Sequence, residues 1–331
     1  MGFRARKSFK FMPGVRMTVS KTGISTSGGI KGARITKSTS GRTTRTVGIP
    51  GTGIYYSKST VSGSRDKRVQ RADAAPPTPP QPPKPGMFAP KWERDLFKAL
   101  TEANFADLPR IAEAYPEATA IAATIDGLHA MAESDTARAL AVCRWAWSTA
   151  GDIATNPFVK KYLSATTVGI PVAAGVTATV PLGRDALGLS LAELEQSAGN
   201  LDAAIAVVEQ LDPSSVAAVS LCELYSLAGR HDEVLDLTNG ISNVDDPTAL
   251  LLTFRGVACR EMGHMTAARE AFREALRGRG RDTAIRHLAW MERARTYLAE
   301  GKTSMARKDL ERILVEDAKY PRVREMLDEL S

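Results

Sequence analysis

Hydrophobic and polar positions alternate with a period of two through the first sixty residues. Residues 15–20, for example, read VRMTVS. Such alternation predicts strands with one apolar face and one polar, basic face. Thr22-Gly23, Ser40-Gly41 and the glycine-rich run 48–53 separate these stretches and predict turns between strands. We therefore expect residues 1–65 to form a small antiparallel β module.

A proline-rich segment follows this module. Between Ala74 and Pro85 the chain reads AAPPTPPQPPKP, with seven prolines in twelve residues. Proline fixes φ and lacks an N–H, so such a run favours extended polyproline II and acts as a semi-rigid spacer. The sequence predicts a linker over residues 66–90. A ligand for an SH3-type domain is the alternative interpretation of the same run.

Downstream of the linker the hydrophobic period becomes helical, and one spacing recurs. The pattern G-x6-G-x4-A-x3-F-x2-A occurs at Gly256, Gly263, Ala268, Phe272 and Ala275. Similar copies surround Gly199, Gly229 and Gly301, so the marker glycines lie 30, 34 and 38 residues apart. A further, degenerate copy includes Gly127, Ala139, Cys143 and Ala146. Self-similarity at this period predicts stacked pairs of helices, in which small residues allow close approach and large apolar residues fill between.

One uncharged segment, Tyr162 to Gly183, interrupts the helical pattern. It reads YLSATTVGIPVAAGVTATVPLG. Its length would permit a membrane span, but its prolines, glycines and threonines make it weakly hydrophobic. Its alternating apolar positions favour a β-hairpin at 166–183. This hairpin would lie between the first helices of the repeat domain, at 91–165, and the repeats at 184–331.

Two resemblances follow from these residues. The segments MGFRARKS, GVRMTVSKTGIS, GARIT and GIPGTGIYYS occur in order, and residues 2–58 resemble the bacterial domain-of-unknown-function 4236 family. That resemblance implies a small β-rich module with no established activity. The helical copies resemble tetratricopeptide repeats, whose period is about 34. The expected fold class is therefore α+β and multi-domain: an antiparallel β module, a proline-rich linker and an all-α helical-repeat solenoid with an inserted β-hairpin.

The net charge of +7 is unevenly distributed. Residues 1–71 contain sixteen Lys and Arg and one acid, whereas residues 72–331 contain 28 Lys and Arg and 36 Asp and Glu. The module therefore carries +15 and the remainder −8, which indicates an anionic partner for the basic end. The candidates for that partner are a nucleic acid or other polyanion, a membrane surface, an acidic protein and the chain's own acidic half. The candidate anion-binding residues are Arg4, Arg6, Lys10, Arg16, Arg34, Arg42 and Arg45. The alternative is that the aromatic residues fill a core while the cations only keep the module soluble.

The repeat spacing also predicts an interaction surface, because the first helix of each pair lines one face of such a solenoid. The residues expected there are Glu193, Gln196, Glu223, Ser226, Arg260, Glu261 and Arg295. A groove that mixes both charge signs suits a peptide or a helix. The alternative is a structural surface that binds no ligand.

The sequence shows no catalytic constellation. There is no HExxH motif or histidine pair, and the three cysteines fall on apolar helix positions. We therefore predict no catalytic residue, no cofactor and no metal. The function that fits best is a non-enzymatic, cytoplasmic protein-interaction scaffold without a membrane partner. A nucleic-acid-associated factor whose basic module binds phosphates is the alternative.

Overall fold

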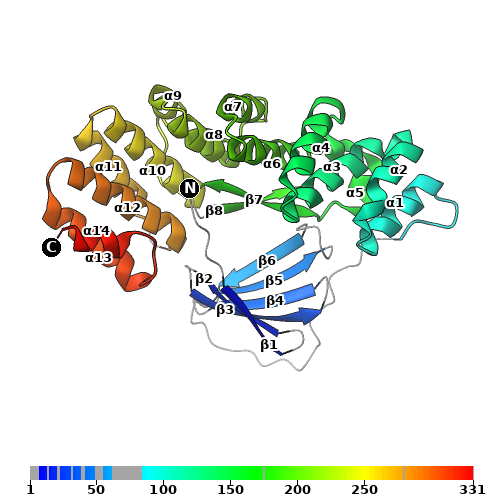
Figure 1. The fold of residues 1–331 in the computed structure, drawn as a ribbon, viewed down its shortest axis with the longest axis horizontal. Coiled ribbons are helices and arrows are strands. Elements are labelled where there is room, and N and C mark those ends of the chain that lie inside the picture. The colour runs from blue at the N-terminus through cyan, green and yellow to red at the C-terminus, as the bar shows by residue number, and fades with distance from the viewer. Residues whose placement is uncertain are drawn as a thin grey trace. The chain divides into compact units, whose positions relative to one another are not determined.

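The computed structural model describes residues 84–173, 176–278 and 280–330 with their side chains, and six earlier strands by their backbone (Figure 1). The strands are β1 (Lys7–Met12), β2 (Val15–Ser20), β3 (Gly23–Ile30), β4 (Ala33–Ser38), β5 (Arg42–Gly48) and β6 (Tyr55–Val61). Each pairs antiparallel with the next, in the order β1 to β6. The predicted antiparallel β module is confirmed. The proline run up to residue 83 lies outside the described residues.

The first helical group consists of α1 (Lys91–Thr101), α2 (Leu108–Ala114), α3 (Pro116–Ala132), α4 (Thr136–Thr149) and α5 (Pro157–Tyr162). Short 3₁₀ turns precede α2 and α5. The helices bury Leu96, Leu108 and Ile121 almost completely, which gives this group its own core. Asp135 begins α4 by accepting the Arg138 backbone N–H, an N-cap that satisfies one of the free donors of the first turn.

The uncharged segment forms the predicted hairpin. Strands β7 (Thr167–Ala173) and β8 (Val176–Pro181) pair with each other, and α6 (Arg184–Ser197) follows. Buried and partly exposed residues alternate along β7, as expected for a strand with one covered face. Among the described residues, no helix has the length and hydrophobicity needed to cross a membrane.

The chain divides into two compact units, and the division falls within β7, β8 and α6. The second unit contains α7 (Leu201–Val208), α8 (Ser215–Leu227), α9 (His231–Leu237), α10 (Asp246–Glu261), α11 (Met265–Ala275), α12 (Thr283–Ala299), α13 (Thr303–Glu316) and α14 (Val323–Asp328). Helix α10 packs against α11, its antiparallel partner, and against α8 and α12. The first helices α8, α10 and α12 therefore stack in sequence, as the repeat pattern predicted.

The marker glycines end the first helix of each pair. Gly199, Gly229, Gly263 and Gly301 all have positive φ, between 72° and 84°. After each, the next residue donates its N–H to the carbonyl five positions earlier, at 2.8 Å in all four copies. This is the hydrogen bond of a Schellman motif, which satisfies a carbonyl that the helix end would leave free. Glycine is favoured there because it has no Cβ to clash at positive φ.

Two earlier helices end in the same way without glycine. Ala103 and Ser134 have φ of 57° and 65°. The N–H groups of Asn104 and Asp135 bond to the carbonyls five residues back, at 2.8 and 2.9 Å. Ala103 and Ser134 lie 31 residues apart, close to the repeat period. Helices α1 and α3 therefore end with the same backbone geometry as α6, α8, α10 and α12, but without the glycine.

In two of the copies, one position in the first helix contacts one position in the second. Gly256 lies seven residues before its marker, and a Cβ placed on it would come within 2.6 Å of the Phe272 ring. Phe272 lies nine residues after the same marker and is fully buried. Gly127 and Cys143 have the same offsets from Ser134, and a Cβ on Gly127 would lie 2.7 Å from the Cys143 Sγ. The degenerate copy is thus in register with the clearest one.

The Gly256 contact gives a stability prediction. Replacing an interior helix glycine by alanine ordinarily stabilises a protein by about 0.5–1 kcal/mol. Here we expect Gly256→Ala to destabilise the helical repeats by about 1–2 kcal/mol, because the methyl group overlaps Phe272. Denaturant unfolding followed by circular dichroism measures the difference. Gly86→Ala is the control, since no atom lies within 4 Å of its added Cβ. Adding Phe272→Leu should recover part of the loss, and a stabilising Gly256→Ala would contradict the contact.

Candidate interaction surfaces

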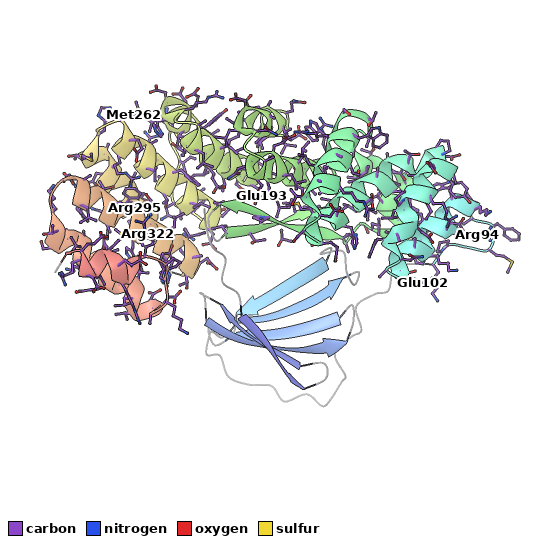
Figure 2. The ribbon with its side chains drawn as sticks, in the orientation of Figure 1. Arg94, Glu102, Glu193, Met262, Arg295 and Arg322 are labelled. Atoms are coloured by element: carbon purple, nitrogen blue, oxygen red, sulfur yellow. The ribbon has the colours of Figure 1, made fainter. Side chains whose placement is uncertain are left out.

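The residues predicted for the repeat surface all lie on first helices of the pairs. Glu193 and Gln196 are on α6, Glu223 and Ser226 on α8, and Arg260, Glu261 and Arg295 at α10 and α12. Figure 2 labels Glu193 and Arg295 on their helices. Gln196 and Ser226 occupy equivalent positions, three residues before their marker glycines, and both are partly exposed. These positions repeat along the stack, which is what a surface built from repeats requires.

Three of the predicted residues, Arg260, Glu261 and Arg295, form one cluster with Glu292 on α12, which the sequence analysis did not predict. One guanidinium nitrogen of Arg260 donates to the Glu292 carboxylate at 2.8 Å and to its backbone carbonyl at 3.1 Å. The same guanidinium binds Glu261 at 2.8 Å, and Arg295 binds the other Glu292 oxygen at 2.5 Å. The side chains of Arg260 and Glu292 are only 13% and 9% exposed. Arg260 therefore joins α10 to α12.

Burial makes this cluster sensitive to its charges. Burial alone lowers the pKa of Arg260, but the neighbouring Glu292 and Glu261 raise it overall, so the guanidinium stays charged. The same carboxylate also acts on Tyr320. Burial is the larger cause and Glu292 the next, and both raise the pKa of the Tyr320 phenol. The side chains of Arg295 and Glu261 are each more than two-fifths exposed, so this part of the cluster lies at the surface. The charged surface of the last two pairs is thus held in place by a buried ion pair.

A second set of ion pairs joins α12 to α13. Arg293 binds Asp309 through two nitrogen–oxygen contacts of 2.7 Å each, and Asp309 is almost fully buried. Such two-point pairing fixes orientation as well as distance. Nearby, Arg286 and His287 share the Glu316 carboxylate at 2.6 and 3.1 Å. Burial lowers the pKa of His287 more than Glu316 raises it, so this histidine favours its neutral form.

The strand register sorts the candidate cations of the β module onto its two faces. Lys10 pairs with Arg16, and the row continues through Ser27, Thr36, Thr44 and Ser59 across all six strands. Alternate residues of a strand share a face, so Arg34 and Arg42 belong to the face of this row. Arg45 pairs with Ile35 and belongs to the opposite face. Arg4 and Arg6 lie outside the described residues.

Two features of these surfaces escaped the sequence analysis. The cationic face is also rich in hydroxyl groups, because Ser or Thr occupies most of its other register positions: Ser8, Thr18, Ser25, Ser27, Thr36, Ser38, Thr44, Thr46, Ser57 and Ser59. The recurrence of Ser and Thr at every second position of these strands is the sequence signal that could have predicted this hydroxyl-rich face. Glu292 is the other feature, and no sequence pattern distinguishes it from an exposed helical glutamate.

The described residues offer little reactive chemistry. Cys143, Cys222 and Cys259 are buried free thiols, and burial raises the pKa of Cys143 and Cys222 to about 12. A thiol with so high a pKa is a weak nucleophile, because the thiolate is the reactive form. Across residues 84–330, apart from the gaps at 174–175 and 279, no group of three or more His, Cys, Asp or Glu could hold a metal ion.

The comparisons with known proteins address the two parts of the chain separately. Residues 3–57 match the family model described as Protein of unknown function (DUF4236), which confirms the resemblance of the β module. None of the curated proteins compared with the chain matches it.

Among solved structures, the chain is similar to the N-terminal domain of the EccA1 ATPase from the ESX-1 secretion system of Mycobacterium tuberculosis. The sequences are 18% identical, the TM-score is 0.52, and the match covers 72% of this chain and 90% of that one. A thermophilic TPR protein of Thermus thermophilus, TTC0263, matches with 17% identity and a TM-score of 0.40, over 62% of this chain and 94% of its own. The similarity to EccA1 shows a shared helical fold.

The Arg260–Glu292 pair gives a second stability prediction. We expect Glu292→Gln to destabilise the repeats by about 3 kcal/mol, because it removes the buried carboxylate partner of Arg260 and leaves only the more exposed Glu261. Glu270→Gln is the matched control: it removes the carboxylate from Arg273, but both side chains are more than half exposed, and such pairs contribute about 0–1 kcal/mol. Denaturant unfolding of the two variants measures both effects. Equal destabilisation would show that Arg260 does not depend on Glu292.

Proposed function

We propose that this chain is a non-enzymatic interaction scaffold whose helical repeats bind a protein or peptide partner. The observation that carries the proposal is the stack of first helices, α8, α10 and α12, which presents equivalent positions at regular intervals. Repeat solenoids use such extended surfaces to bind other proteins. The ion pairs that join α10 to α12 and α12 to α13 favour binding further, because a surface ordered in advance loses less entropy when a partner binds.

The chemistry of this surface favours a peptide or helix that carries both charge signs. Glu193 lies on α6, Glu223 on α8 and Arg295 on α12. A mixed surface selects its partner by matching charges along its length. We place the scaffold in the cytoplasm, where a reducing environment keeps thiols such as the three cysteines free.

Site-specific photocrosslinking tests the partner surface. A photoreactive amino acid is placed at Gln196, at Ser226 or, as control, at Arg273, which is 70% exposed on the second helix α11. In cells that express the full chain, we expect Gln196 and Ser226 to crosslink the same protein and Arg273 not to do so. Charge reversal by Glu223→Arg should then weaken binding of the identified protein at least tenfold without changing the circular dichroism spectrum. Equal crosslinking at all three positions would contradict the proposal.

A second candidate function rests on the β module. The register gathers Lys10, Arg16, Arg34 and Arg42 with many hydroxyl residues on one face, and both groups are typical donors to phosphate oxygens. This composition supports the docking of an anionic partner, with nucleic acid as the alternative to an acidic protein. The predicted second partner of the scaffold is therefore a polyanion.

Salt-dependent binding tests this second candidate. The full chain is titrated against labelled single-stranded and duplex DNA at two salt concentrations, with fluorescence anisotropy as the readout. We expect the triple variant Arg16→Gln, Arg34→Gln, Arg42→Gln to weaken binding and to reduce the duplex salt slope by about 3, since each phosphate contact contributes about 0.9. The control, Lys37→Gln, Arg45→Gln, Lys58→Gln, removes the same charge from the opposite face. No binding at low salt would exclude nucleic acid and leave an acidic protein as the anion.

A further inference from the structure

An apolar groove of about 390 Å³ lies across α2, α3 and α4 of the first helical group. Its walls are formed mainly by Leu108, Pro109, Ala112, Ala123, Val142 and Trp145. Trp145 is 44% exposed, which is unusual for so large an apolar side chain on a helix that already buries Ala139, Cys143 and Ala146. Small residues along both walls keep the groove open, and Trp145 supplies an aromatic surface at its edge.

The polar groups of the groove are mostly acidic. Asp126 lies in its lining, is nearly buried and is paired with Arg138. Burial raises the pKa of this carboxyl more than Arg138 lowers it. Glu113 also lines the groove, is exposed, and forms no ion pair with any residue that the structure describes. An apolar segment that carries a positive charge would therefore match this groove.

Such a segment lies just before α1. The Ala89 N–H donates to the Gly86 carbonyl at 3.0 Å and closes a turn with Met87 and Phe88 at its tip. Met87 is 83% exposed and Phe88 97% exposed. Pro85 and Pro90 flank the turn and restrict its backbone, and Lys84 and Lys91 place a positive charge on either side. The turn presents two large apolar side chains in an ordered conformation.

The groove and the turn have complementary surfaces, yet within one chain neither covers the other. Met87 and Phe88 stay exposed while Trp145 and the groove walls remain accessible. We propose that the turn of one copy binds the groove of a second copy, with Met87 and Phe88 against Trp145 and a flanking lysine near Glu113. Reciprocal exchange would form this contact twice in a two-fold dimer, the commonest symmetry of homo-oligomers. The ordered turn would lose little entropy on binding.

Sedimentation of the full chain over a range of concentrations tests the proposal. We expect a concentration-dependent dimer, with Phe88→Ser raising its dissociation constant at least tenfold. Ala141→Arg, which places bulk and positive charge on the groove wall, should have a similar effect. Val315→Ser is the matched control, because Val315 is 87% exposed on α13 and lies in the other unit. A synthetic peptide of residues 84–91 should dissociate the wild-type dimer.

Three outcomes would overturn the proposal. A chain that is monomeric at all concentrations would exclude the dimer, and a Phe88-dependent change in Trp145 fluorescence in that monomer would show that the turn fills its own groove. A dimer that resists both Phe88→Ser and Ala141→Arg would have its interface elsewhere. A dimer weakened equally by Val315→Ser would not depend specifically on the turn. Partner crosslinking at Gln196 and Ser226 is scored separately, so failure there leaves this result unaffected.

Discussion

The left-handed residue at the end of each first helix is the constraint on which the repeat architecture depends. It reverses the chain direction while one backbone hydrogen bond, from the following N–H to the carbonyl five residues earlier, satisfies the helix end. Because the reversal has the same geometry in each copy, the second helix returns along the first at a fixed offset. In two copies the residues seven positions before and nine positions after the turn are in contact, Gly256 with Phe272 and Gly127 with Cys143.

Most of this architecture could be predicted from the sequence, because glycine marks positive φ. Gly199, Gly229, Gly263 and Gly301 identify four turns directly. Ala103 and Ser134 adopt the same conformation without a glycine. The sequence therefore predicted only a degenerate copy around Ser134 and no copy around Ala103. Non-glycine residues at positive φ carry a steric cost that the surrounding helices must offset. Such positions become visible only when the tertiary structure that holds them is known.

The candidate surfaces were less predictable than the fold. Spacing placed Arg260, Glu261 and Arg295 on the first helices of their pairs, where the structure also has them, but the ion pairs of a charged side chain depend on the neighbouring helix. Glu292 lies 32 residues from Arg260 along the chain, and no periodicity connects the two. In the β module, alternation predicted a basic face, yet the strand register decided that Arg45 lies apart from Arg34 and Arg42. In both examples, contacts between residues far apart in the sequence determine the surroundings of a charged side chain, and the local sequence pattern does not contain that information.

In three of the copies, the residues seven positions before and nine positions after the turn differ in size. Gly256 accompanies Phe272, Ala294 accompanies Leu310, and Gly127 accompanies Cys143, so a smaller residue on one helix is matched by a larger one on the other. A second helix from the wrong copy would leave a cavity or a clash at that position. In these three copies, size matching favours the native helix pair and opposes the exchange of helices between similar repeats during folding, a characteristic failure of repeat proteins. It also means that these two positions should change together as the copies diverge.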